Sequence, residues 1–370
     1  MFANQYLGKR VFVTGHTGFK GAWLCEWLLQ LGADVTGYSD RDADQPLFQQ
    51  LGLAGRLRHR LGDVRDAAAL QGAVRDATPD VVFHLAAQSL VRPSYIDPAG
   101  TFATNVMGTV HLLEALRLAD RPVACVVVTS DKCYENREVL HGYRESDPLG
   151  GHDPYSASKG AAEIVVQAYR RSFFSESGNQ VYLASARAGN VIGGGDGSAD
   201  RIVPDCVRSL QSAAPVLVRN ALATRPWQHV LEPLSGYLWL GAVMSGALRL
   251  PRVRAPADVC TAFNFGPLPE SNRSVGELVD EVFRHWPGQR VDAANATAVH
   301  EAGLLGLSID KAFHLLGWHP VWNFARSVAA SLHWYRHVHD GGDALMHTRA
   351  DLNAYMDDAR ANGLRWTGAE

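Results

Sequence analysis

Five polar side chains near the middle of the chain have types and a spacing that suit proton transfer. Tyr155 and Lys159 are four residues apart, so a helix would present both on one face. A lysine ammonium beside a phenol lowers the pKa of the phenol, and Tyr155 could then take the proton of a substrate hydroxyl. The same pair also occurs by chance on solvated helix faces. Its interpretation therefore depends on the residues that accompany it.

Ser130, Asp131 and Lys132 form the second polar group, and they directly follow an apolar run at residues 124–129. Such a run predicts a buried strand. Catalytic groups of open α/β sheets lie at the carboxyl ends of strands, which is where these three residues would be. Neighbours of opposite charge shift each other's pKa, as an acid and a base would require. A plain loop ion pair between Asp131 and Lys132 is the alternative.

Strands and helices that could position these groups alternate through the first half of the chain. The predicted strands are residues 11–14, 35–38, 57–61, 81–85, 124–129 and 181–186, and the predicted helices are 23–31, 67–74, 102–118 and 157–174. Near-continuous apolar strands alternating with helices are typical of a parallel sheet covered on both faces. Because crossovers are right-handed, the fold class is α/β, a doubly wound Rossmann sheet.

A glycine-rich loop follows the first predicted strand and opens directly into a helix. Its glycines have GxxGxxG spacing, which lets the backbone turn tightly and approach a pyrophosphate at the helix N-terminus. The strand before the loop and the helix after it favour dinucleotide binding over an ordinary turn. The residues assigned to the cofactor here are Gly15, His16, Thr17, Gly18, Phe19, Lys20 and Gly21.

The residues after the second and third strands bear on which dinucleotide binds. Ser39 or Asp40 could hold the adenosine ribose of NAD, whereas Arg41 could equally face the 2′-phosphate of NADP. We expect NAD. Asp63 could bind the adenine amino group, or it could be the N-cap of the helix predicted to begin at Ala67.

The alternation loosens after about residue 190, where three consecutive glycines and several prolines interrupt it. We therefore predict a cofactor-binding Rossmann domain over residues 1–190. Residues 191–370 would mainly form a smaller substrate-binding domain, with about 260–267 returning to the sheet as a strand.

Composition excludes several classes of protein. A net charge of −3 argues against nucleic acid as a partner, and 46% hydrophobic with 20% charged residues is typical of a soluble globular chain. The five cysteines are scattered without metal-site spacing, and we expect no metal and no disulfide. No run approaches the roughly 20 apolar residues of a membrane span, so we expect a cytoplasmic protein. His333 and His337 lack the glutamate of a zinc motif and indicate a solvated helix face.

Several segments carry a resemblance to a known family. Residues 84–88, 105–109 and 187–191 resemble the extended short-chain dehydrogenase/reductases that act on nucleotide sugars. Residues 15–21, 129–136 and 225–233 are more similar still to the nucleotide-sugar 4,6-dehydratases, in particular to the branch that acts on CDP-glucose. The resemblance extends to about residue 334, and the residues beyond it have no assigned role.

The resemblance implies a reaction with tightly held NAD. C4 of glucose is oxidised, water is lost across C5 and C6, and the hydride returns to C6, which gives CDP-4-keto-6-deoxyglucose. Lys159 would hold the nicotinamide ribose, and Ser130 with Tyr155 would hold the C4 oxygen. Asp131 would protonate the leaving hydroxyl, and Lys132 would take the C5 proton. Related dehydratases have glutamate in place of Lys132, so that role depends on the CDP-glucose branch.

The resemblance also implies further contacts and an assembly. It adds to the cofactor site Val64, Leu85, Ala86 and Ala87, and it assigns to the substrate Gln88, Asn105, Arg187, Asn190, Arg225, Trp227 and His229. Arginine suits a diphosphate because its planar fork binds bidentately, although each arginine could instead form a structural ion pair. Trp227 could stack on a base or be a buried aromatic residue. The helices at 102–118 and 157–174 would form a homodimer.

Other functions share this sequence pattern. A nucleotide-sugar 4-epimerase or reductase needs Tyr155 and Lys159 but no acid/base pair at Asp131 and Lys132. A dehydratase could act on another nucleoside diphosphate sugar. A binding protein that senses NAD(H) without catalysis could use the same scaffold, although it would not need these catalytic groups.

Overall fold

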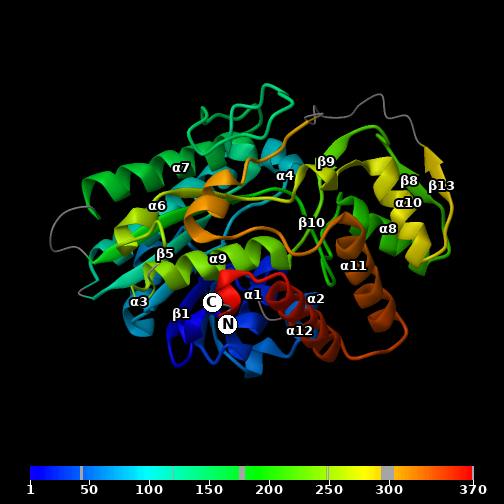
Figure 1. The fold of residues 1–370 in the computed structure, drawn as a ribbon. Coiled ribbons are helices and arrows are strands. Elements are labelled where there is room, and N and C mark those ends of the chain that lie inside the picture. The colour runs from blue at the N-terminus through cyan, green and yellow to red at the C-terminus, as the bar shows by residue number, and fades with distance from the viewer. Residues whose placement is uncertain are drawn as a thin grey trace.

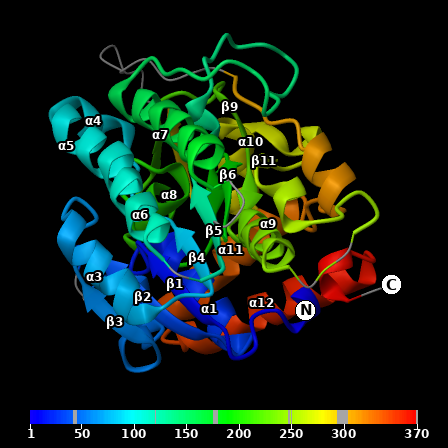
Figure 2. The same cartoon turned by 90° about the vertical axis from the view of Figure 1, so that its left-hand side faces the viewer.

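The centre of the molecule is a seven-stranded parallel sheet in the order β11-β6-β5-β4-β1-β2-β3 (Figures 1 and 2). The computed structural model describes residues 1–41, 45–119, 121–174, 180–246, 248, 250–292 and 304–368. The strands are β1 (Arg10–Thr14), β2 (Asp34–Ser39), β3 (Arg58–Leu61), β4 (Val81–His84), β5 (Val123–Val128), β6 (Val181–Ala188) and β11 (Ala262–Phe265). The predicted doubly wound α/β fold is confirmed.

Helices cover both faces of the sheet, as Figure 2 shows. One face carries α3 (Ala67–Ala77), α6 (Gly108–Arg117) and α7 (Pro154–Ser172), and the other carries α1 (Phe19–Gln30) and α9 (Leu231–Met244). Side chains alternate along a strand, so Phe12 of β1 packs into the first layer while Val11 and Val13 pack into the second. This burial on two sides explains why the strands are near-continuous apolar runs.

Three predicted helices have different boundaries in the structure. The predicted 102–118 helix begins with α5 (Pro98–Phe102) and passes through a π-helical turn (Ala103–Met107) into α6. Helix α7 begins earlier than predicted because Pro154 occupies its first turn and Asp153 caps it, accepting the Ser156 N–H at 2.9 Å. Helix α1 includes Phe19–Ala22, which apolar spacing did not reveal.

The second half of the chain adds small elements around this sheet. β11 pairs in parallel with β6, so the chain returns to the sheet. Short two-stranded pairs join β10 to β7, β12 to β9 and β13 to β8. Figure 1 shows α8, α10, β8 and β13 gathered at one end of the molecule. The remaining elements are α2 (Pro46–Gln50), α4 (Val91–Ile96), β7 (Val191–Ile192), α8 (Ile202–Gln211), β8 (Val216–Val218), β9 (Thr224–Pro226), β10 (Gln228–His229), β12 (Asn272–Ser274), α10 (Val275–His285), β13 (Arg290–Asp292), α11 (Phe324–His339) and α12 (Ala344–Ala361).

The carboxyl-terminal residues, which had no assigned role, pack against the amino-terminal half. The Phe2 ring stacks on Trp366 with centroids 5.0 Å apart, so the two termini lie side by side (Figures 1 and 2). The fully buried Glu26 of α1 accepts hydrogen bonds from Arg56 and from Arg349 of α12. Among the described residues no helix is long and apolar enough to cross a membrane.

A second buried carboxylate, Glu232, joins α9 to α12 and to the loop before α11. It accepts the N–H groups of Trp322 at 2.7 Å and Val321 at 2.9 Å, and the Tyr355 hydroxyl at 2.8 Å. Burial raises the pKa of Glu232 to about 7. This carboxyl group therefore anchors the helix that faces the candidate site.

Replacing Glu232 with alanine should destabilise the fold, because two buried donors and one partly buried donor would lose their acceptor. We expect the free energy of unfolding to fall by about 3 kcal/mol. Urea denaturation measures this, with the exposed Glu270→Ala as a control that should leave the midpoint unchanged. Equal midpoints for the two variants would contradict the anchoring role of Glu232.

Candidate active site

The candidate site lies at the carboxyl ends of β1, β4 and β5, which are neighbours in the sheet. The glycine loop follows β1, residues 85–88 follow β4, and residues 129–132 follow β5. The loop after β4 touches the glycine loop, because the Ala86 N–H donates to Thr14 Oγ1 at 3.1 Å. The parallel topology thus brings together three segments that are far apart in the sequence.

The glycine loop has the geometry of an anion site. Gly15 has φ +70°, and a Cβ there would lie 2.7 Å from Ala86 N, while a Cβ at Gly21 would lie 2.2 Å from Gly15 O. Those two glycines are required by the protein's own packing. Gly18 is not, since its nearest neighbour would be 3.4 Å away, and it sits at the N-cap of α1 without a side-chain cap. The first N–H groups of α1 are therefore accessible to a pyrophosphate, and the loop fits a dinucleotide.

The side chains predicted to bind the adenosine of the cofactor differ in their exposure and in their hydrogen bonds within the protein. Thr17 Oγ1 and Ser39 Oγ share a hydrogen bond of 2.9 Å, so the Ser39 hydroxyl is engaged within the protein. Asp40 is exposed and remains the candidate for the ribose. His16 is buried and shares a hydrogen bond of 2.7 Å with His59, and burial lowers its pKa to about 4.

Asp63 is not the cap of α3. Its carboxylate accepts the Arg65 N–H at 2.8 Å and pairs with the Arg65 guanidinium, which lowers the pKa of Asp63. The cap is Asp66, whose carboxylate accepts the Ala69 N–H at 3.0 Å. Val64 is buried beneath Gly108, where a Cβ would meet the Val64 side chain at 2.7 Å.

The five candidate catalytic residues come together beside this loop. Ser130 Oγ donates to Asp131 Oδ1 at 2.9 Å and accepts the Lys132 N–H at 3.2 Å in a single turn of 3-10 helix (Asp131–Cys133). Tyr155 and Lys159 are buried on α7, and the Ser130 hydroxyl lies close enough to Tyr155 to oppose the rise of its pKa. The strand end and the helix face therefore meet, although neither shows this in the sequence alone.

Burial dominates the ionisation of these groups. It raises the pKa of Asp131, against the opposing effects of Lys132 and Ser130, and it raises the pKa of Tyr155 to about 12. It lowers the pKa of Lys159 to about 8. The net shift of the Tyr155 pKa is therefore upward, opposite to the lowering expected from Lys159, because desolvation is its largest cause.

Lys20 extends this group of charges from the glycine loop. Burial, together with repulsion from Arg201 and Lys159, lowers its pKa to about 7, and only Asp131 opposes the shift. The charge of one residue of the loop is thus coupled to the predicted acid and to Lys159.

A buried polar network joins helix α7 to strands β5 and β6. Glu163 lies four residues after Lys159 on α7 and accepts Thr129 Oγ1 at 2.5 Å, Ser185 Oγ at 2.8 Å and Arg187 Nη2 at 2.7 Å. Arg187 also donates to the Tyr134 hydroxyl at 2.7 Å. Sequence analysis missed Glu163, although its spacing from Tyr155 and Lys159 on one helical face was the available signal.

Several predicted substrate contacts have structural partners instead. Arg187 forms the buried ion pair with Glu163, the alternative that the sequence left open. Asn105 bonds the backbone of Gln88 and donates to Ser158 Oγ at 2.8 Å, while the Gln88 side chain bonds Leu90 and Thr101. These two amides therefore position the loop after β4.

Of the predicted substrate residues in the second half of the chain, two are buried and one is partly exposed. His229 is fully buried between Trp23 and Trp322, with centroids 5.7 and 5.0 Å from theirs, so its ring is part of an aromatic cluster. Trp227 is buried and donates to Arg273 O at 2.9 Å. Arg225 is partly exposed, and it donates to Thr224 O at 2.7 Å.

Asn190 is partly exposed and lies beside the catalytic turn. A Cβ at the adjacent Gly189 would lie 3.0 Å from Asp131 Oδ2. Within the described ranges, no three His, Cys, Asp or Glu side chains are placed to hold a metal ion. His333 and His337 of α11 each pack against another imidazole, that of His285 or His347.

Comparison with known proteins places this site in a family. Residues 11–244 match the NAD dependent epimerase/dehydratase family. The CDP-glucose 4,6-dehydratase of Salmonella typhimurium is 45% identical over 360 residues, which cover 95% of this chain and 98% of that protein. A dTDP-glucose 4,6-dehydratase of Streptomyces venezuelae, solved with NAD bound, matches 90% of this chain and 99% of its own with a TM-score of 0.74 and 24% identity.

A UDP-glucose 4-epimerase of Thermotoga maritima has the same TM-score of 0.74 at 18% identity, with coverage of 89% and 99%. The fold is therefore shared by dehydratases and epimerases, and it does not separate them. The parallel sheet and the glycine loop agree with the family match. The match of residues 11–244 and the 45% identity to a dehydratase show that the chain belongs to the NAD-dependent epimerase/dehydratase family.

Proposed function

We propose that this protein is a nucleotide-sugar 4,6-dehydratase that converts CDP-glucose to CDP-4-keto-6-deoxyglucose. The arrangement of Asp131 carries the proposal, because a buried carboxyl with a raised pKa lies beside Ser130 and Tyr155. A 4-epimerase needs no acid at this place, whereas the loss of water does. The 45% identity to a CDP-glucose 4,6-dehydratase over nearly the whole of both chains supports the choice of nucleotide.

Each side chain has a task in this reaction. NAD, when bound, supplies the acceptor for the C4 hydride and returns that hydride to C6. Tyr155 takes the proton of the C4 hydroxyl while Ser130 holds the same oxygen. The charge of Lys159, one helical turn from Tyr155, favours the phenolate and fades above about pH 8 as the lysine loses its proton.

Elimination then uses the residues after β5. A ketone at C4 acidifies the C5 proton, which the neutral amine form of Lys132 removes. Asp131 donates the proton that turns the C6 hydroxyl into water, and burial keeps that proton on the carboxyl group. Asp131 thus supplies one proton of the departing water, whose oxygen and other hydrogen come from the C6 hydroxyl, and Lys132 keeps the proton taken from C5.

The two parts of the chain divide the substrate between them. We assign NAD to residues 1–190 and the nucleotide end of the substrate mainly to residues 191–370. Among the predicted contacts from residue 187 onward, Asn190 and Arg225 keep partly exposed side chains, and Arg225 suits the diphosphate. The cytoplasmic location stays a prediction of the sequence.

Assay of the purified protein with several nucleoside diphosphate glucoses tests the function. We expect the 4-keto product from CDP-glucose without net formation of NADH, because the hydride removed from C4 is returned to C6. Solvent deuterium should appear at C5, since the proton there is exchanged during elimination. Stoichiometric NADH, or a 4-epimer without loss of water, would contradict the dehydratase.

Three variants separate oxidation from elimination. Tyr155→Phe should form no NADH with substrate, because the C4 hydroxyl keeps its proton. Asp131→Asn and Lys132→Met should still oxidise C4 and show a transient absorbance of NADH, yet form the 6-deoxy product at least 100-fold more slowly. Normal product formation by both would remove the pair from the chemistry.

We also propose a homodimer through α6 and α7. Ile164 on α7 is 57% exposed and Phe173, at its end, is 42% exposed, so apolar surface remains on this side of the molecule. Light scattering at micromolar concentration should give twice the mass of the chain, and Ile164→Glu should give monomers. Leu217→Glu, at a side chain that is 61% exposed on strand β8, is the control and should leave the dimer intact. A monomeric unmodified protein would contradict the assembly.

A further inference from the structure

The side chain of Tyr237 on α9 is fully buried, yet its hydroxyl has no hydrogen-bond partner among the described residues. Buried phenols normally find a partner, because an unpaired polar group in the interior is costly. Tyr6, which packs against the same helix, follows that rule and donates to Leu238 O at 2.6 Å. The Tyr237 hydroxyl is therefore a donor that the protein itself leaves unused.

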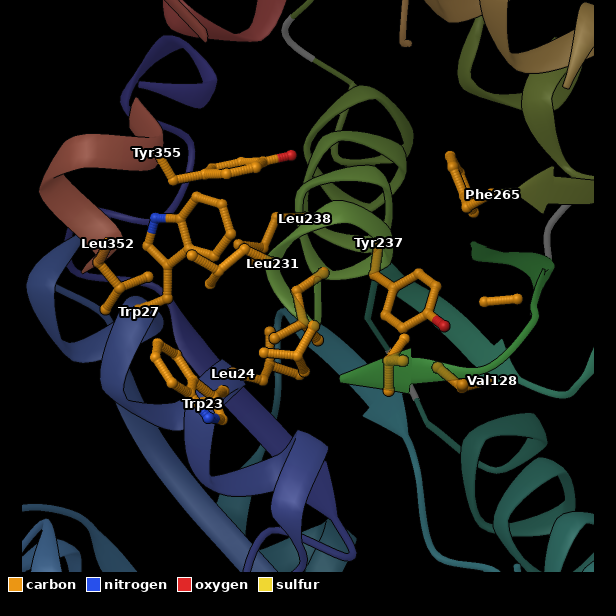
Figure 3. Packing of buried hydrophobic residues seen from close by; sticks show 14 of the residues in the cluster. Trp23, Leu24, Trp27, Val128, Leu231, Tyr237, Leu238, Phe265, Leu352 and Tyr355 are labelled. Atoms are coloured by element: carbon orange, nitrogen blue, oxygen red, sulfur yellow. The ribbon is translucent and has the colours of Figure 1, made fainter. Parts of the chain in front are cut away.

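Packing fixes the ring in one position. Figure 3 shows it projecting from α9 on the side opposite Trp27 and Tyr355. Its centroid lies 5.8 Å from that of Phe265 in an edge-to-face contact, and Lys20 Nζ lies 6.0 Å from the ring centroid. Phe265 and Lys20 contact the ring of Tyr237, and neither accepts a hydrogen bond from its hydroxyl.

The hydroxyl adjoins the reaction centre. Helix α9 packs against β5, the strand that Ser130 and Asp131 follow, and Lys20 of the glycine loop lies over the Tyr237 ring. Burial raises the pKa of Tyr237, and the negative forms of Tyr155 and Asp131 add to the shift. These are the residues assigned to the C4 hydroxyl and to the C6 hydroxyl. A hydrogen-bond donor between them would face the edge of the sugar that carries both groups.

We propose that Tyr237 is a further substrate-binding residue, whose hydroxyl donates a hydrogen bond to a hydroxyl oxygen on the C4–C6 edge of the hexose. The inference rests on the proposed function, since it assumes that a nucleotide sugar occupies this site. The pyrophosphate of the cofactor belongs at the N-terminus of α1, so the hydroxyl next to Asp131 is left for the sugar. The bound hexose thus supplies the partner that this buried phenol lacks.

Tyr237→Phe tests the proposal, because it removes only the hydroxyl and keeps the packed ring. Affinities are measured by calorimetry on NAD-loaded protein in a Tyr155→Phe background, which prevents turnover. The added substitution should weaken CDP-glucose about tenfold and leave the affinity for CDP unchanged, since CDP lacks the hexose. Retention of NAD should not change.

Tyr6→Phe is the matched control. It removes the same atom from another buried tyrosine that contacts α9, one whose hydroxyl already has a partner in the protein, and it should change neither affinity. The melting temperatures should also differ, because Tyr6→Phe loses a hydrogen bond whereas Tyr237→Phe loses an unpaired hydroxyl. Tyr6→Phe should lower the melting temperature, and Tyr237→Phe should not.

The outcomes keep this inference separate from the proposed function. Turnover of CDP-glucose by the unmodified protein decides the function, whereas the ratio of the CDP-glucose and CDP affinities decides the role of Tyr237. An unchanged affinity for CDP-glucose, an equal loss for CDP, or weaker retention of NAD would each overturn the role. So would a background protein that binds CDP-glucose no better than CDP.

Discussion

The buried carboxylate of Glu163 is the interaction on which the catalytic site depends. It joins α7, which carries Tyr155 and Lys159, to the end of β5 through Thr129 and to β6 through Ser185 and Arg187. Removing one partner of such a pair typically costs about 3–5 kcal/mol, because the remaining charge is left buried and unpaired. Helix α7, which carries Tyr155, is thus held against the end of β5, which Ser130 follows.

Burial gives this fixed geometry its chemical properties. The pKa values of Lys20 and Lys159 fall to about 7 and about 8, while the pKa of Asp131 rises. Desolvation moves acids and bases toward their neutral forms, so groups that would be fully charged in water can exchange protons near neutral pH. The same desolvation raises the pKa of Tyr155, which makes the positive charge of Lys159 important for any proton transfer to the phenol.

Helix α12 and the residues after it, which lie beyond the family match, hold α9 in place. Glu232 and Glu26 attach α12 to α9 and α1, and the aromatic residues of the carboxyl terminus pack on Trp27 and Phe2. These contacts fix the helix that presents Tyr237 to the reaction centre. Residues far from the chemistry therefore set the position of a side chain within it.

The sequence by itself determined the doubly wound sheet, the glycine loop and the set of polar residues after β5 and on α7, because periodicity and local spacing are properties of neighbours along the chain. Only the tertiary structure decided that Arg187 pairs with Glu163, that Gln88 and Asn105 hold a loop, and that His229 is buried. It also decided that burial governs the pKa of Tyr155. Partner choice and desolvation depend on groups that meet across long sequence separations, and a linear pattern does not record which side chains will surround a residue.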